Sequence, residues 1–427
     1  MTAQQTIALL RRYESRNVLF TETDGSWPIV WDRAQGVHVW DASGKKYLDL
    51  TAAFGVAAAG HANPRVVKAG QQQMARLLHA MGDVHPHALK AQLARELSRL
   101  TFERWSKHTG KVIFSNSGFE AVESALKTAL LATGQRGVMA FEGGYHGLGY
   151  GALNATHRKL FRHPFRTQLR EFGHFASFPR TADDLPALKK SLQTIFRREK
   201  IGAILVEPIQ ARGGINVPPP NFLPLLRELC DQHGAMLILD EIYTGFGRTG
   251  KWFACEHCGV IPDVICLGKA LTGGFPLSAC VGRADLMDAA WPPSNGEAIH
   301  TSTFLGHPVG CAMALAQIKE IQRLNLVKHS ADLGVHLLDE LSQVTAYSAS
   351  SRGLGLMAGL ELTLPDGRPA TDVALSAIKN LLHRGYIFLP EGEHANVIGF
   401  TPPLTITKVQ LTKAVRELKK VLSQEQN

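Results

Sequence analysis

The sequence has no long hydrophobic run and no concentrated block of one charge. Its longest candidate, residues 51–59, is far shorter than the roughly 20 apolar residues of a membrane span, and no basic segment precedes the brief apolar patch at 7–10. The 46 Lys and Arg residues outnumber the 37 Asp and Glu, but they are dispersed and no recognised nucleic-acid motif contains them. These absences argue against a membrane, secreted or nucleic-acid-binding protein, and we expect a cytoplasmic location.

The pattern of cysteines offers little support for a metal site or for disulfides. Of the six cysteines, Cys255 and Cys258 have a spacing that zinc ligands also use. A structural zinc site normally needs a second pair of ligands, and none lies nearby in the sequence. We therefore predict a reduced protein with free thiols and no metal.

The middle of the chain alternates short apolar runs with helical patterns. The runs that predict strands are 112–114, 138–141, 203–206, 236–239, 264–267 and 279–281. Their continuous apolar character is typical of strands that helices cover on both faces of a sheet. The alternation with helical segments, such as 121–131 and 223–233, predicts an α/β domain with a mainly parallel sheet.

The two ends of the chain differ from this central part. The elements expected there are strands at 37–40 and 47–50, helices at 311–324 and 325–343, a strand at 353–362 and a closing helix at 408–423. We predict an N-terminal segment (1–60), a large α/β domain (61–315) and a C-terminal segment (316–427). The first and last would together form one small α/β domain beside the large one.

A first candidate for ligand binding lies directly after the strand at 112–114. Ligands of open parallel sheets bind beyond the carboxyl ends of the strands. Ser117, followed by Glu120, has the pattern of a capping box that opens a helix. The free N–H groups of such a helix start bind phosphate. An ordinary helix cap would show the same pattern.

Two further residues follow apolar strands. Asp240 is either a strand-end cap or the partner of a buried cation, such as a protonated pyridinium nitrogen. Lys269 ends the strand at 264–267 and precedes Gly273-Gly274. A buried amine there can lose its proton and form a Schiff base, although a lysine whose head reaches water is an alternative. The helix start at Ser117 could bind a phosphate, Asp240 a ring nitrogen and Lys269 an aldehyde. Together these are three of the parts that a pyridoxal-phosphate site needs.

With these residues the chain resembles the class III aminotransferases of the fold-type I pyridoxal-phosphate superfamily, over nearly its whole length. The motifs that carry the resemblance are Gly60-His61 with Pro64, Ser117-Gly118 with Glu120-Ala121, Gly144-Tyr145-His146-Gly147, Glu207-Pro208, Asp240-Glu241, 244–250, Gly268-Lys269-Ala270, and Ser302-Thr303-Phe304 with Gly306 and Pro308. The resemblance implies a seven-stranded type of large sheet, pyridoxal 5'-phosphate as cofactor, and transfer of an amino group between an amino acid or amine and a 2-oxo acid.

The resemblance also implies a role for each matching residue. Lys269 would form the internal aldimine and move a proton between the substrate Cα and the cofactor, which ends as pyridoxamine phosphate. Asp240 would hold the pyridinium and Tyr145 would stack on the ring. The hydroxyl of Tyr243 would lie near the phenolic oxygen of the cofactor. The implied phosphate ligands are Ser117, Gly118, Phe119 and, from the partner chain of a homodimer or dimer of dimers, Thr303.

The chain departs from the family where the substrate binds. Arginine residues that relatives use for substrate carboxylates are replaced by Leu148 and by Gly399. A glutamate in the relatives' Gln-Gly-Glu-Gly-Gly segment is Arg212 here. We infer that Arg212 supplies the carboxylate clamp from the opposite side, since a guanidinium suits bidentate binding. The alternative is an Arg212 that points to solvent.

The expected pocket is apolar and aromatic. Phe54 matches a pocket-wall position and joins Leu148 and Tyr243, although Phe54 and Leu148 could equally be core residues. We expect a substrate with an apolar body, and alanine with pyruvate fits this pocket better than glutamate. An amino-acid racemase, epimerase or aminomutase on the same fold is the alternative function, followed by a decarboxylase or a non-catalytic cofactor-binding protein.

Overall fold

A seven-stranded sheet forms the centre of the computed structural model, which describes residues 1–22 and 25–425. The strand order is β4-β10-β9-β8-β7-β5-β6. The bounds are β4 (Gly110–Ser115), β5 (Gly137–Phe141), β6 (Gly173–Ala176), β7 (Ile201–Val206), β8 (Met236–Asp240), β9 (Val264–Leu267) and β10 (Ser278–Arg283). Only β10 runs antiparallel to its neighbours, so the predicted mainly parallel sheet is confirmed. The sequence prediction missed β6, a short edge strand that is only partly buried.

Helices cover both faces of this sheet, because its strands are apolar on both sides. One face packs against α6 (Gly118–Thr133), α7 (Tyr150–Ala155) and α11 (Ala284–Ala290). The other face packs against α4 (Ala88–Leu100), α9 (Leu185–Arg198), α10 (Phe222–His233) and α12 (Pro308–Arg323). Successive strand residues alternate between the two clusters: Ala203 and Leu205 face α6, whereas Ile204 and Val206 face the other layer.

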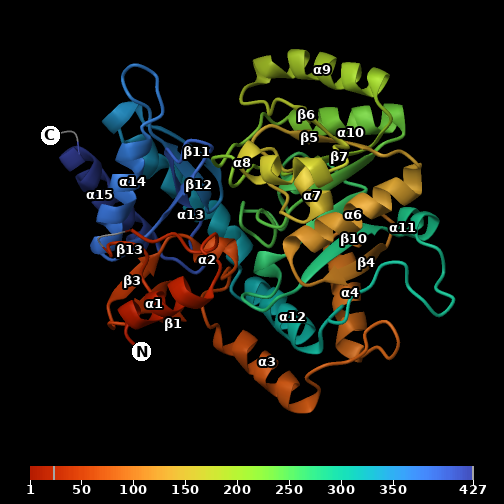
Figure 1. Cartoon of the computed structure of the whole chain (residues 1–427), viewed down its shortest axis with the longest axis horizontal. Helices are drawn as coiled ribbons and strands as arrows, with labels where there is room; N and C mark the ends of the chain where they lie inside the picture. The colour runs from red at the N-terminus through yellow and green to blue at the C-terminus, as the bar shows by residue number, and fades with distance from the viewer. Residues whose placement is uncertain (23–24, 426–427) are drawn as a thin grey trace.

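The two ends of the chain lie side by side at the left of Figure 1. β1 (Trp31–Gln35), β2 (His38–Asp41) and β3 (Lys46–Asp49) form a sheet that β13 (Tyr386–Ile387) completes in parallel with β3. A second small sheet contains β11 (Ser350–Leu354), β12 (Met357–Glu361), β15 (Val397–Phe400) and β14 (Leu389–Glu391) in that order. The helices beside it are α13 (Leu326–Ser342), α14 (Thr371–His383) and α15 (Lys408–Glu425). The domain boundaries at residues 60 and 315 stay a prediction.

The single strand expected at 353–362 is wrong. Residues there belong to a hairpin in which β11 and β12 pair antiparallel, with Leu354 opposite Met357. Gly355 reverses the chain at a φ of +56°, and a Cβ at this position would lie 2.4 Å from the carbonyl carbon of Thr249. Only glycine combines that conformation with so close an approach.

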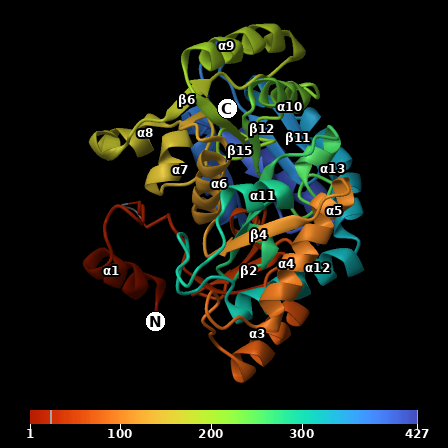
Figure 2. The same ribbon diagram turned by 90° about the vertical axis from the view of Figure 1, so that its right-hand side faces the viewer.

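The N-terminal helix α1 (Ala3–Tyr13) contains no buried residue and stands away from the rest of the chain in Figure 2. The short helix α2 (Ala52–Gly55) and α3 (Pro64–Arg76) then lead into the large sheet. Across the described ranges, no helix combines the length and apolar character needed to cross a membrane.

Candidate active site

A cavity of about 430 Å³ lies beyond the carboxyl ends of β8 and β9. Its walls come from the start of α6, the segment after β5, the segment after β7 and the residues after β8 and β9. The side chains and glycines that line it include Gly118, Phe119, Tyr145, Leu148, Arg212, Asp240, Tyr243 and Lys269. The sheet therefore brings together eight of the site residues predicted from the sequence.

Lys269 lies at the base of this cavity, two residues after β9. Its backbone has a φ of +42°, a conformation that residues other than glycine seldom adopt and that often marks functional sites. The Nζ atom lies 4.0 Å from the centroid of the Tyr243 ring. Burial lowers the pKa of Lys269 to about 8, although the negative charges of Asp240 and Glu207 oppose that shift. The amine is therefore partly neutral near physiological pH and can attack a carbonyl carbon.

Asp240 ends β8 and is almost completely buried. One carboxylate oxygen lies 2.8 Å from Nδ1 of His146, and the other accepts a hydrogen bond from the Ile242 N–H at 3.2 Å. The backbone of His146 is held in turn by the Thr156 hydroxyl, which accepts its N–H at 2.9 Å. The sequence prediction omitted His146 from the site, although the Gly-Tyr-His-Gly motif contained it. The structure makes it the residue that orients the Asp240 carboxylate.

The start of α6 provides donors for an anion. Gly118 and Phe119 line the cavity, and as the first residues of α6 their N–H groups have no acceptor within the helix. Ser117 precedes them, and its N–H and hydroxyl donate to the Glu120 carboxylate at 2.7 and 3.0 Å. A Cβ at Gly118 would meet Ile242 at 3.0 Å, so a larger residue would narrow the cavity. A helix start of this kind can bind an anion, and the phosphate site itself stays a prediction.

Tyr145 and Glu207 form the side wall. The Tyr145 N–H donates to Glu207 at 2.9 Å, and the other carboxylate oxygen accepts from the Ala211 N–H at 3.0 Å. Burial raises the pKa of Glu207. The Tyr145 ring contacts Phe161 edge-on at 5.7 Å between centroids. Through these two hydrogen bonds, Glu207 connects the backbone next to Arg212 to the segment that carries the Tyr145 ring.

Arg212 lines the main cavity and also the cavity that adjoins it. Its guanidinium carbon is 5.4 Å from the centroid of the Tyr145 ring, and its Nε is buried without a hydrogen-bond partner. Within residues 1–22 and 25–425, no carboxylate lies within ion-pair distance of it. Arg212 therefore faces the cavity rather than solvent, with its charge available to a ligand.

A second cavity of about 370 Å³ adjoins the main cavity and shares Arg212. Phe54 lines it and is 49% exposed, with a left-handed backbone at φ +63°. The neighbouring Gly55 leaves room for Tyr243, whose ring would lie 3.0 Å from a Cβ at that position. Leu148 is similarly exposed, at 48%, in the main cavity. Phe54 and Leu148 are thus cavity walls, and the alternative that they are core residues is wrong.

Glu391, the last residue of β14, is a charged cavity residue that sequence reasoning missed. Its side chain is 7% exposed and lines the second cavity beside Arg212 and Phe54. Burial raises its pKa to about 7, against the positive charges of Arg212 and Lys269. A Cβ at Gly399 would lie 3.2 Å from the Glu391 Cγ, so the glycine leaves the space that Glu391 fills. In the sequence, the glycine at position 399 was the feature that could have indicated a side chain such as Glu391 in this space.

Two predicted residues lie differently from the rest. The Tyr243 ring faces Lys269, while its hydroxyl lies 3.1 Å from the Thr401 hydroxyl and thus points toward the small domain. Thr303 is exposed and lines neither cavity of this chain. Over the described residues no metal-binding cluster is found, and Cys255 and Cys258 are free thiols.

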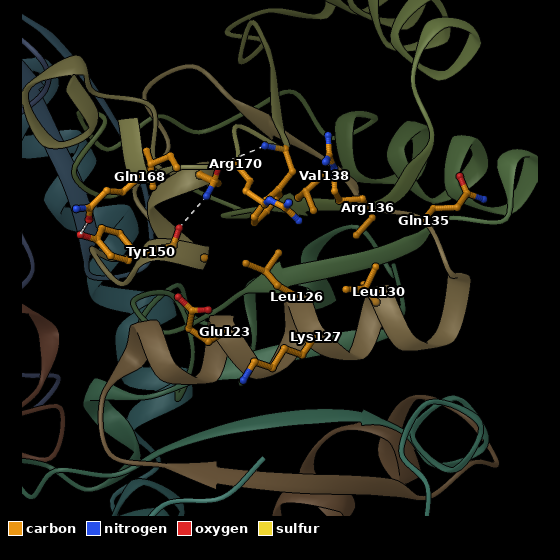
Figure 3. A pocket seen from close by; sticks show the side chains of 16 residues that line it. Glu123, Leu126, Lys127, Leu130, Gln135, Arg136, Val138, Tyr150, Gln168 and Arg170 are labelled. Carbon is orange, nitrogen blue, oxygen red and sulfur yellow. Dashed lines mark hydrogen bonds between the residues drawn. The ribbon is translucent and has the colours of Figure 1, made fainter. Parts of the chain in front are cut away.

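Another cavity, of about 360 Å³, lies beside α6, and Lys269 is not among the residues that line it (Figure 3). Leu126 and Leu130 of α6 point toward Val138 and Arg136, and Tyr150 bonds to Gln168 at one side. Its walls are mostly apolar, and none of the site residues predicted from the sequence lines it.

Comparison with known proteins agrees with this geometry. The model of the family described as "Aminotransferase class-III" matches residues 20–422. The putrescine aminotransferase of Pectobacterium atrosepticum is 37% identical, covering 98% of this chain and 88% of its own. The acetylornithine aminotransferase of Methanosarcina mazei is also 37% identical, over 92% of both chains.

Solved structures agree as well. An amine transaminase from an uncultivated Pseudomonas species, solved in its pyridoxal-phosphate-bound form, has a TM-score of 0.88 at 28% identity, with 97% of this chain and 98% of that chain covered. A free lysine at the end of β9, the carboxylate at the end of β8 and the open helix start fit this cofactor. The chain therefore belongs to the class-III aminotransferases and is a pyridoxal-phosphate-dependent transaminase.

Proposed function

We propose that this transaminase moves an amino group from an amine or amino acid with an apolar body to a small 2-oxo acid such as pyruvate. The observation that carries the proposal is Arg212, a partly buried guanidinium without a carboxylate partner in the same cavity as Lys269. A planar guanidinium binds a carboxylate through two parallel hydrogen bonds. In this proposal Arg212 binds the carboxylate of the oxo acid.

The residues at the other end of the cavity would hold the cofactor. Bound pyridoxal phosphate supplies an electron sink for the bond that breaks at the substrate Cα. Lys269 would hold the cofactor and move the proton at the substrate Cα, as an amine whose pKa is lowered to about 8 can do near neutral pH. Asp240, oriented by His146, keeps the ring nitrogen protonated.

The phosphate and the ring faces would be held by the surrounding wall. Ser117, Gly118 and Phe119 would bind the phosphate at the start of α6, where the helix dipole favours an anion. Tyr145 would stack on the cofactor ring. Tyr243 would contact the lysine through its ring, since its hydroxyl is engaged by Thr401.

The pocket walls support a small acceptor. Phe54 and Leu148 present apolar surface where a second carboxylate would have to lose its water without a partner. Pyruvate has only one carboxylate, so Arg212 is sufficient for it. The names of the two curated relatives describe amino donors with an amine at the end of a carbon chain, which is the donor class that this pocket suits.

We also propose a homodimer, or a dimer of dimers, with Thr303 reaching the phosphate site of the partner subunit. Exposed apolar side chains gather along one stretch that begins in the last turn of α3 and continues beyond it, namely Met74, Leu77, Leu78, Met81 and Val84. Such patches usually mark an interface. Light scattering should give a dimer or tetramer mass, and Thr303→Ala should weaken cofactor binding. The six free cysteines suit a reducing compartment, which supports a cytoplasmic location.

A panel of amino donors with pyruvate and 2-oxoglutarate tests the substrate assignment. We expect turnover with pyruvate and an apolar amine or alanine, and little with 2-oxoglutarate. Incubation with the donor alone adds a second test. A transaminase converts the cofactor to its amine form and stops, whereas a racemase or epimerase leaves the cofactor unchanged and inverts the amino acid. Efficient use of 2-oxoglutarate, or inversion, would overturn the proposal.

A further inference from the structure

Glu391 differs from the other buried acids around the cavity because it has no partner. Asp240 is bonded by His146 and the Ile242 N–H, and Glu207 by two backbone N–H groups. The Glu391 side chain has neither a hydrogen bond nor an ion pair in the parts of the chain that the structure describes, although its backbone belongs to the β14–β15 ladder. A carboxylate that served only to hold the fold would have such donors, because an unpaired buried charge is costly.

The surrounding chain leaves space for this carboxylate. β14 and β15 pair with Leu389 opposite Gly399, and a side chain at 399 would collide with the Glu391 Cγ. Phe54 and Trp27 line the same cavity as Glu391. The other acid in that cavity, Glu22, forms an ion pair with Lys379. Glu391 is thus the cavity's unpaired acid.

Three positive charges lie near Glu391, and each has another interaction partner or role. Arg212, Lys269 and Arg158 lower its pKa through their charges, but none of the three forms an ion pair with it. Arg158 donates a hydrogen bond to the Arg212 carbonyl oxygen at 2.7 Å. Lys269 is committed to the cofactor in the proposed function, and Arg212 to the carboxylate of the oxo acid. During the half-reaction with the amino donor, no oxo acid is bound. A cation from the donor itself would then be the natural partner of Glu391.

We propose that Glu391 binds a second ammonium group on the amino donor and makes the enzyme selective for diamines or diamino acids over monoamines. The inference rests on the proposed transaminase function. The donor's first amine would react beside Lys269, and its carbon chain would pass Arg212 and lie against Phe54. Its distal ammonium would then reach Glu391. Burial raises the pKa of Glu391 to about 7 despite the positive charges nearby, and a bound cation would keep the carboxylate ionised.

The experiment compares matched donors with the holoenzyme and pyruvate. One pair is 1,4-diaminobutane with 1-aminobutane, and the other is ornithine with norvaline. Wild type should prefer the member with the distal ammonium in at least one pair. Glu391→Gln should lower kcat/KM for that donor about 10- to 100-fold, since a hydrogen bond to a charged group is lost, and leave the monoamine nearly unchanged. The control, Glu393→Gln, alters an exposed carboxylate two residues away and should keep the preference.

A binding measurement keeps this inference separate from the proposed function. N,N,N',N'-tetramethyl-1,4-diaminobutane carries two cations but cannot form an imine, so its affinity by calorimetry does not depend on turnover. Glu391→Gln should weaken its binding about 10-fold, whereas Glu393→Gln should not. Equal loss for diamine and monoamine, or unchanged affinity for the tertiary diamine, would overturn the inference. Absence of any transamination by wild type, with intact binding of the tertiary diamine, would instead overturn the proposed function.

Discussion

At the proposed cofactor end of the cavity the buried carboxylates accept hydrogen bonds, whereas at the proposed substrate end two charged side chains have no hydrogen-bond or ion-pair partner among the described residues. Asp240 and Glu207 are held by His146 and by backbone N–H groups. The side chains of Arg212 and Glu391 line the adjoining cavity without such a partner. A group that serves the same bound molecule in every cycle can be fixed in advance. A group that meets two different substrates in turn must keep its charge available.

The largest expected effect concerns Lys269, the residue on which the cofactor end depends. Lys269→Ala removes the amine that, in the proposed function, would hold the cofactor and move the proton. We expect kcat to fall roughly 10²- to 10⁴-fold and the visible absorbance of the lysine-bound cofactor to disappear. Stopped-flow absorbance and steady-state assays measure both. Lys251→Ala, at an exposed position, is the control, and retention of the absorbance band in Lys269→Ala would contradict the assignment.

His146→Leu tests whether the fixed partners at the cofactor end matter for chemistry. Asp240 would lose its 2.8 Å contact, so its carboxylate would no longer be held in one orientation toward the proposed cofactor site. We expect kcat to fall roughly 10- to 100-fold at neutral pH. Steady-state assays of the holoenzyme measure this loss, and His174→Leu in β6 is the control. A kcat close to that of wild type in His146→Leu would show that the contact is not needed for the chemistry.

Arg212→Ala tests whether the guanidinium of Arg212 binds the carboxylate of the oxo acid. Loss of the clamp should raise KM for pyruvate roughly 10- to 100-fold, because hydrogen bonds between charged groups are removed. The KM for a monoamine donor should change little, since that donor has no carboxylate. Arg180→Ala removes an exposed arginine outside both cavities and should have no such effect. An unchanged KM for every acid substrate would contradict the clamp.

A smaller effect concerns the pH dependence of cofactor attachment. Burial lowers the pKa of Lys269 to about 8, so the neutral, reactive amine predominates above that pH and decreases below it. The rate at which cofactor-free enzyme binds pyridoxal phosphate should therefore fall about 10-fold for each pH unit below 8 and level off above it. Absorbance of the attached cofactor measures this rate. A rate that continued to rise to pH 10 would indicate an ordinary lysine pKa.

The sequence predicted the cofactor end better than the substrate end. Its strands are short but uninterrupted apolar runs, and Asp240 and Lys269 stand at their carboxyl ends, where parallel sheets bind ligands. Glu391 was not predicted because the space for its side chain is provided by another strand. Gly399 on the neighbouring strand β15 has no side chain, and Glu391 fills the space that results. The hairpin at β11 and β12 also escaped, because one glycine at a positive φ reverses a run that otherwise reads as continuous. The contact between His146 and Asp240 joins segments 94 residues apart, a distance that no local pattern reports.

The smallest expected effect comes from Gly399→Ala, which adds a single methyl group beside Glu391. It tests whether the space around Glu391 can change without affecting Arg212. The new Cβ would lie 3.2 Å from the Glu391 Cγ and 3.5 Å from the Leu389 carbonyl oxygen, so Glu391 must shift by a few tenths of an ångström. Because a flexible side chain can give way, the free energy of unfolding should fall by about 1 kcal/mol, at the low end of the cost of overpacking. The preference for diamines over monoamines should fall only severalfold, with KM for pyruvate unchanged. Thermal unfolding and the paired-donor assay measure these effects. An altered KM for pyruvate with an intact donor preference would show instead that position 399 acts on Arg212, and that the two unpaired charges at the substrate end are not independent.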